Sequence, residues 1–172
     1  MIHVSSLSGL RGAADGLGRF DLLTLLSPGA TANDWRDLAP ERHLELAFHD
    51  IVEPKADHVA PDAGMVHAIL EFGRDADASR PLLIHCWAGI SRSSAAAYAI
   101  ACARNPGFEA EIATELRRRS PVVTPNRLMV ALADDLLGRR GVMVEAIAGI
   151  GRGADAFEGT PYVVPLTWPM QD

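Results

Sequence analysis

Short apolar runs dominate the first half of this chain, and each run is bounded by glycine, proline or polar residues. Runs of this length with such boundaries are typical of buried strands. The longest, FDLLTLL, ends at a Ser-Pro-Gly turn signal. The pattern predicts strands at residues 2–4, 20–26, 44–48 and 82–84.

Apolar residues at spacings of three and four predict helices between and after these strands. The clearest helix places Met65, Ile69 and Phe72 on one side and starts near Pro61 and Asp62. Proline suits the first helical position, and aspartate complements the helix dipole. Further helices are predicted at residues 93–103, 109–119, 124–137 and 141–150, with a weak helix at 7–17, a loop with a helical turn at 33–40 and an irregular tail after residue 153.

The order of these elements predicts the fold class. Strands alternate with helices early in the chain, and only helices are predicted afterwards. This order favours an α/β fold with a central, mainly parallel sheet of about four to five strands flanked by helices. The 172 residues fit a single domain over 1–172, with a core at about 20–137 and a C-terminal helix at about 141–151.

Composition excludes several classes of function. A net charge of −6 argues against a general nucleic-acid binder, which usually carries a basic excess. The two cysteines, Cys86 and Cys102, make neither a disulfide framework nor a zinc motif, so no metal is expected. The sequence shows no basic leader and no apolar segment of membrane-spanning length. We therefore expect a cytoplasmic protein without a membrane partner.

The stretch HCWAGISRS, from His85 to Ser93, holds the candidate chemistry. It joins the strand at 82–84 to an Ala-rich helix, so loop amides and the positive helix end can bind a phosphate dianion. Gly89 permits the unusual dihedrals of such a loop, and Arg92 can hold two phosphate oxygens in a bidentate fork. The predicted phosphate-binding residues are Trp87, Ala88, Gly89, Ile90, Ser91 and Arg92.

The same positive groups act on the sulfur of Cys86. Cations and helix N-termini favour the thiolate, so Cys86 is predicted to be a nucleophile aimed at phosphorus. His85 can fix the loop by bonding the backbone or the carbonyl of the cysteine. Ser93 can offer its hydroxyl to the sulfur when the sulfur leaves. Cys102 lies further along an apolar helix, where core packing is the simpler interpretation.

HCWAGISRSS resembles the signature of the cysteine-dependent protein tyrosine phosphatase superfamily, and most closely that of compact dual-specificity-like bacterial phosphatases. The resemblance implies the cysteine-phosphatase fold and hydrolysis of phosphotyrosine, alone or with dual specificity, through a phosphocysteine intermediate. It implies a phosphorylated protein or a small aryl phosphate as substrate, and neither metal nor cofactor. A weaker resemblance covers about 20–137 and implies that Asn126 braces the phosphate loop.

The resemblance also implies an aspartate general acid on a separate loop. Such a residue typically contributes about 10²- to 10⁴-fold to the rate. Asp50 follows the strand at 44–48 and stands 36 residues before Cys86, so it is the first choice. Asp57 is the second, and Asp62 is assigned to the helix start.

Other functions remain open at this stage. The sequence lacks the Trp-Pro-Asp acid loop and the tyrosine-recognition segment of the large tyrosine-specific enzymes, so phosphotyrosine preference is undecided. The variable loop positions carry no lysine, which makes phosphoinositide specificity less favoured. The alternatives are a rhodanese-like sulfurtransferase, which also holds a cysteine in an anion loop, and a catalytically silent phosphate-binding module.

Overall fold

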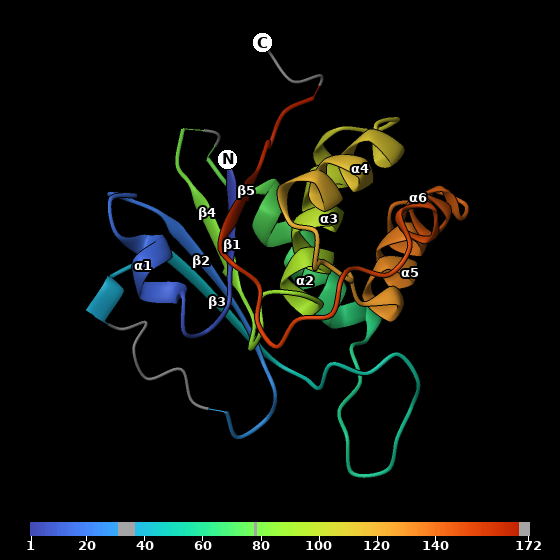
Figure 1. The fold of residues 1–172 in the computed structure, drawn as a ribbon, viewed down its shortest axis with the longest axis horizontal. Helices are drawn as coiled ribbons and strands as arrows, with labels where there is room; N and C mark the ends of the chain where they lie inside the picture. Colours follow the sequence, from blue (N-terminus) through green and yellow to red (C-terminus); the bar gives the residue numbers. More distant parts are fainter. Residues whose placement is uncertain (31–36, 78, 169–172) are drawn as a thin grey trace.

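A single sheet with the strand order β3-β2-β4-β1-β5 lies at the centre of the computed structural model, which describes residues 1–30, 37–77 and 79–168 (Figure 1). β1 pairs in parallel with β4, β4 with β2 and β2 with β3, whereas β5 is antiparallel to β1. The predicted α/β class with a mainly parallel sheet is confirmed. The strands are β1 (Ile2–Ser5), β2 (Asp21–Leu26), β3 (Arg42–Ala47), β4 (Leu82–His85) and β5 (Tyr162–Val164).

Helices cover both faces of this sheet, but unequally (Figure 1). α1 (Leu10–Ala14) lies on one face, where it packs in a small core with Phe20 and Leu22 of the β2 region. The larger core lies under the other helices on the opposite face. These helices are α2 (Ala63–Arg74), α3 (Arg92–Arg104), α4 (Glu109–Arg119), α5 (Arg127–Leu136) and α6 (Val142–Ile150).

α2, α4 and α5 all pack on α3, which is buried over nearly its whole length. Its many alanines allow neighbouring helices to approach closely. At Gly73 of α2, an added Cβ would lie 2.5 Å from the side chain of Ile100, so this side chain packs directly against the backbone of α2. The buried helix predicted at residues 93–103 is confirmed, and its first turn holds the candidate arginine.

The tail after α6 differs from the prediction of an irregular segment. Residues Tyr162–Val164 form β5 and pair with β1 along the sheet edge. Three residues are too few for a periodic apolar signal, and the pairing depends on a strand at the other end of the chain. The weak helix predicted at 7–17 is shorter, at Leu10–Ala14. The helical turn predicted at 33–40 lies partly outside the described residues. In the described part of the chain, no helix is both long and apolar enough to cross a membrane.

Candidate active site

The carboxyl ends of the parallel strands meet around one open cavity. Ser27 follows β2, Asp50 comes shortly after β3, and Cys86 follows β4 directly. Because α3 begins at Arg92, the positive end of this helix also faces the carboxyl ends of the strands. The cavity has a volume of about 500 Å³ and is lined by Ser27, Ala30, Asp50, Cys86, Trp87, Ala88, Ile90, Ser91, Arg92, Ala156 and Phe157.

The sulfur of Cys86 lies at the floor of this cavity and has two polar neighbours. The hydroxyl of Ser93 is 3.1 Å from Sγ, and the backbone N–H of Gly89 donates to Sγ over 3.3 Å. Cys86 and Ser93 are both buried. The backbone of Gly89 and the hydroxyl of Ser93 thus both lie within hydrogen-bond distance of the buried sulfur.

Gly89 is required by both its conformation and its surroundings. Its φ of 72° lies in the left-handed region, which residues with a Cβ adopt at a cost. A Cβ here would also come within 2.8 Å of the backbone nitrogen of Ser6. The loop is fixed on the same side by the N–H of Leu7, which donates to the carbonyl of Trp87 over 3.0 Å.

The guanidinium of Arg92 is buried beneath the loop, with only 4% of the residue exposed. Nη1 donates to the carbonyl of Phe48 over 2.7 Å and lies 3.4 Å from Oγ of Ser27. Nε has no hydrogen-bond partner among the described residues and stands 4.0 Å from Oδ2 of Asp50. The side chain is therefore held at Nη1, while the buried Nε makes no hydrogen bond within the described residues.

His85 is fully buried below the loop. Its Nε2 is 2.8 Å from the hydroxyl of Thr24, which is also 3.0 Å from Nε2 of His43. Burial lowers the pKa of His85 to about 4, although its interaction with the backbone of Cys86 acts in the opposite direction. The imidazole is thus neutral at pH 7 and links the loop to β2.

The three aspartates considered as general acid occupy different places. Asp50 lines the cavity, with 35% of its side chain exposed, and its Oδ1 accepts from Ser91 Oγ over 2.7 Å. Asp57 is exposed, with a φ of 61°, and does not line that cavity. Asp62 caps α2 by accepting from the N–H of Met65. Of the three, only Asp50 shares a cavity with the sulfur.

Asn126 connects three segments around the site. Its Oδ1 accepts from the N–H of Met129 and so caps α5, while its Nδ2 donates to Asp50 Oδ1 over 2.8 Å and to the carbonyl of Ile51. Its backbone N–H donates to the carbonyl of Ser91. The side chain thus holds the segment of Asp50, and the backbone contacts the phosphate loop.

The sequence pattern does not predict two features of the cavity. The loop pattern predicts that Ser91 binds phosphate, and it does not predict the contact of the Ser91 hydroxyl with Asp50. Ala156 and Phe157 form part of the wall, although the tail was interpreted as irregular. No periodic signal marks these two residues, and they reach the site because the N–H of Gly159 donates to the carbonyl of Ala88 over 2.9 Å.

Solved structures with the same architecture share this arrangement of strands and helices. Tk-PTP in its active form matches with a TM-score of 0.53 and 20% identity, covering 78% of this chain and 88% of that one. PTPMT1 matches with a TM-score of 0.59 and 15% identity, covering 86% and 95%. TpbA from P. aeruginosa matches with a TM-score of 0.50 and 18% identity, covering 85% and 86%.

All three are cysteine-based protein tyrosine phosphatases. The chain has their fold. The resemblance noted in the loop sequence therefore extends to the architecture that carries the loop. No protein-family model and no curated relative matches the sequence, so the structural likeness and the loop residues are what link this chain to the protein tyrosine phosphatase fold.

Proposed function

We propose that the protein is a cysteine-dependent phosphatase that hydrolyses phosphotyrosine, alone or with dual specificity, through a phosphocysteine intermediate. The observation that carries the proposal is the placement of Cys86, Arg92 and Asp50 around one cavity at the carboxyl edge of the sheet. A sulfurtransferase or a silent binding module would need the anion loop, but neither would need a carboxylate beside it.

In the first step, the Cys86 thiolate attacks phosphorus and the bond to the substrate oxygen breaks. Asp50, initially protonated, gives its proton to that departing oxygen. Arg92 and the loop amides hold the equatorial phosphoryl oxygens, whose charge must be stabilised in a site of this kind. Arg92 lines the cavity and its Nε makes no hydrogen bond to a described residue, which supports this role, because the guanidinium can take an anion without losing its bond to the carbonyl of Phe48.

In the second step, water attacks the phosphocysteine and the sulfur leaves as a thiolate. Asp50, now a carboxylate, accepts the proton of the attacking water. The hydroxyl of Ser93, 3.1 Å from Sγ, can donate to the departing sulfur. Ser91 and Asn126 both bond Oδ1 of Asp50, which leaves Oδ2 as the oxygen that exchanges the proton. Neither step requires a metal or a cofactor.

The substrate is proposed to be a phosphorylated protein, with small aryl phosphates as models. A structure of PTPMT1 holds the phosphoinositide PI(5)P, so lipid phosphates are the main competing substrates. The variable loop positions of this chain, including Trp87 and Ile90, carry no cation for a polyanionic headgroup. This favours a substrate whose only strong anionic group is the phosphate that is removed.

An assay of aryl phosphate hydrolysis in the presence of a chelator tests the proposal. We expect turnover with the wild-type protein, and a loss on the order of 10⁶-fold for Cys86→Ser, the scale of removing a catalytic nucleophile elsewhere. Cys102→Ser is the matched control and should keep its activity. Turnover that survives in Cys86→Ser, or transfer of sulfur from thiosulfate without phosphatase activity, contradicts the proposal.

A further inference from the structure

A second cavity adjoins the candidate active site and shares two of its walls. Trp87 of the phosphate loop and Phe157 of the tail line both cavities. These side chains are 57% and 88% exposed, which is unusual for large aromatic residues in a chain whose other apolar residues are mostly buried. Their position suggests that they contact a ligand.

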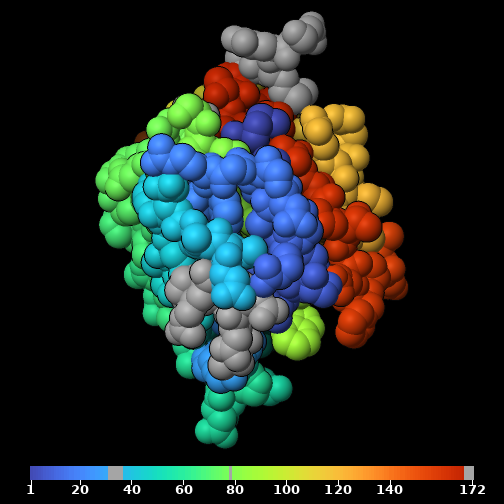
Figure 2. All heavy atoms as spheres, turned by 90° about the vertical axis from the view of Figure 1, so that its left-hand side faces the viewer, coloured from blue at the N-terminus to red at the C-terminus, as the bar shows by residue number. Residues whose placement is uncertain are grey.

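The second cavity is mainly apolar and has a volume of about 270 Å³. Leu7, Leu10 and Leu38 are its aliphatic lining residues, and the segment around α1 and the C-terminal tail lie side by side on this face of the molecule (Figure 2). Such a volume is below the usual range for a whole small-molecule ligand, and it suits a single side chain. The remaining lining residues are Ser8, Arg11 and Glu158.

The walls of this cavity are tied to the phosphate loop on both sides. The N–H of Leu7 donates to the carbonyl of Trp87, and the N–H of Gly159 donates to the carbonyl of Ala88. Glu158 in turn accepts hydrogen bonds from the hydroxyls of Ser6 and Ser8. A cavity with walls fixed in this way requires little ordering when a ligand enters.

We propose that this second cavity is a subsite for a large apolar side chain that flanks the phosphorylated residue of a peptide substrate. The inference rests on the proposed function, since the phosphoryl group must lie over Cys86 for the neighbouring residue to reach the subsite. The ring of phosphotyrosine would pass between the phosphate loop and Phe157, and the aromatic pair would separate it from the flanking side chain.

The charges of the cavity favour a peptide over a phosphorylated lipid. Arg11 is the one cation among its described lining residues, and it already pairs with Asp37 at 3.6 Å. The carboxylate of Glu158 lies on the same wall. A second anionic group of a lipid headgroup would therefore meet as much negative as positive charge, whereas an uncharged apolar side chain buries surface without this conflict.

Short phosphotyrosine peptides, with leucine or asparagine placed in turn at each flanking position, test the subsite. At one position, we expect leucine to raise kcat/KM about tenfold over asparagine, mostly through KM, in line with partial burial of a leucine side chain. Leu38→Ser and Phe157→Ala should reduce this ratio to near one. Leu136→Ser, an exposed leucine on α5, is the matched control and should keep the full ratio.

Each result separates the subsite from the proposed function. Every variant is also assayed with a small aryl phosphate and melted thermally. These two measurements show how far a variant has lost its fold or its catalytic activity in general. Equal turnover of all leucine and asparagine peptides overturns the subsite and leaves the phosphatase proposal standing. If Leu38→Ser impairs only a phospholipid monoester in mixed micelles, the peptide assignment is wrong. No hydrolysis of any phosphate ester by the wild type means that the proposed function itself has failed.

Discussion

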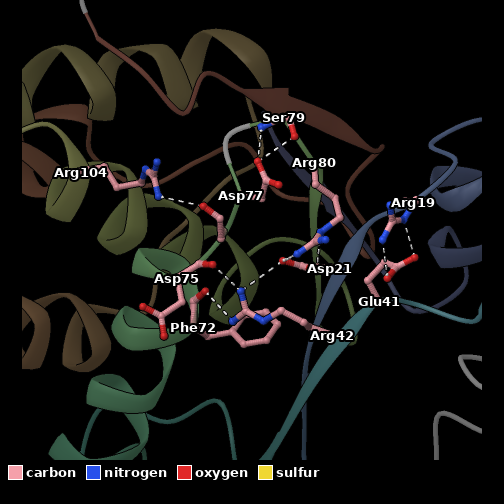
Figure 3. A network of polar contacts seen from close by, with 11 residues as sticks. Arg19, Asp21, Glu41, Arg42, Phe72, Asp75, Asp77, Ser79, Arg80 and Arg104 are labelled. Atoms are coloured by element: carbon pink, nitrogen blue, oxygen red, sulfur yellow. Dashed lines mark hydrogen bonds and ion pairs between the residues drawn. The ribbon is translucent and has the colours of Figure 1, made fainter.

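The two edges of the same parallel sheet both hold buried charges, but they use them in opposite ways. At the carboxyl edge, Arg92 is 4% exposed and its Nε stands 4.0 Å from Asp50. At the amino edge, Asp21 is 1% exposed and lies 2.9 Å from Arg80 and 3.3 Å from Arg42 (Figure 3). The opposite charges are therefore further apart at the carboxyl edge than at the amino edge.

The amino-edge network surrounds its charges from several directions, with Oδ1 of Asp21 and Nε of Arg80 meeting as an ion pair at 2.9 Å without a hydrogen bond. Besides Asp21, Arg42 donates to the carbonyls of Asp75 and Phe72 at the end of α2 (Figure 3). Its guanidinium also lies 4.3 Å from the centre of the Phe72 ring, within range of a cation–π contact. The network links β2, β3 and the end of α2, so its role is to hold the scaffold together.

At the carboxyl edge, the buried guanidinium of Arg92 is only partly hydrogen-bonded by the protein. Arg92 lines the cavity and is fixed through Nη1 by the carbonyl of Phe48 and, at 3.4 Å, by Ser27, while its Nε makes no hydrogen bond to a described residue. A buried arginine thus contributes to stability where its donors are filled by the protein, and to binding where some of them are left for a ligand. Substitutions at the two edges should therefore affect different measurements.

The largest difference is expected for Arg92→Ala. Removing this guanidinium takes away the main positive charge at the phosphoryl oxygens and should lower kcat/KM by roughly 10³–10⁵-fold, the range seen for an arginine that stabilises phosphoryl transfer. Arg42→Ala is the control at the other edge and should retain turnover. Steady-state kinetics with an aryl phosphate gives both values, and comparable losses in the two variants would remove the proposed distinction.

A smaller loss is expected for Asp50→Asn. The amide keeps much of the shape but cannot supply a proton, so kcat should fall by about 10²–10⁴-fold, with tight binding of vanadate retained. The loss should shrink for substrates with acidic leaving groups, which need less protonation. Asp57→Asn, at the exposed position outside the cavity, is the matched control. If Asp57→Asn shows the loss and Asp50→Asn does not, the assignment of the acid is reversed.

Asp21→Asn should produce the opposite kind of effect. It leaves the two arginines without their carboxylate, which costs 3–5 kcal/mol where such pairs are fully buried. Because the side chains of Arg42 and Arg80 are 30% and 19% exposed, we expect about 2–3 kcal/mol of lost stability, a fall in Tm of roughly 5–10 °C. Thermal melts measure this loss, and kcat at a temperature well below Tm should stay close to the wild-type value.

The two edges also differ in how far the sequence predicts them. The phosphate loop is local: Cys86, Gly89, Arg92 and Ser93 stand within eight consecutive residues, so their spacing alone indicates an anion site between a strand and a helix. The predicted strands and long helices follow in the same way from local periodicity. Asp50 could be suggested because catalytic side chains tend to follow parallel strands in this class of fold.

The amino-edge network and the tail are non-local. Asp21, Arg42 and Arg80 come from three strand starts that meet only when β2 pairs with β3 and β4, and nothing in their own segments marks them as partners. Phe157 likewise reaches the cavity through β5 pairing with β1 and through Gly159 bonding to Ala88. Contacts that depend on strand register between distant segments leave no periodic trace in one sequence.

Lowering the pH should reduce the stability of the folded protein through His85, the buried base at the carboxyl edge of the sheet. Its pKa lies near 4 in the folded protein because of burial, below the ordinary value of 6.5. Between these values the unfolded chain binds a proton that the folded protein does not, so stability falls as the pH drops from about 6.5 towards 4. At pH 5 the loss relative to pH 8 is about 2 kcal/mol.

Denaturant unfolding of the wild type and His85→Gln across pH 4–8 measures this loss. Titratable groups that do not interact with His85 cancel in the difference between the two profiles. The difference should therefore grow with pH between about 4 and 6.5 and level off above it, while His85→Gln keeps a hydrogen-bonding side chain near Thr24. Parallel profiles would mean that His85 binds its proton equally well in the folded protein and in the unfolded chain, so that burial does not lower its pKa. A difference that falls as the pH rises would mean that the folded protein holds a protonated imidazole beside Cys86.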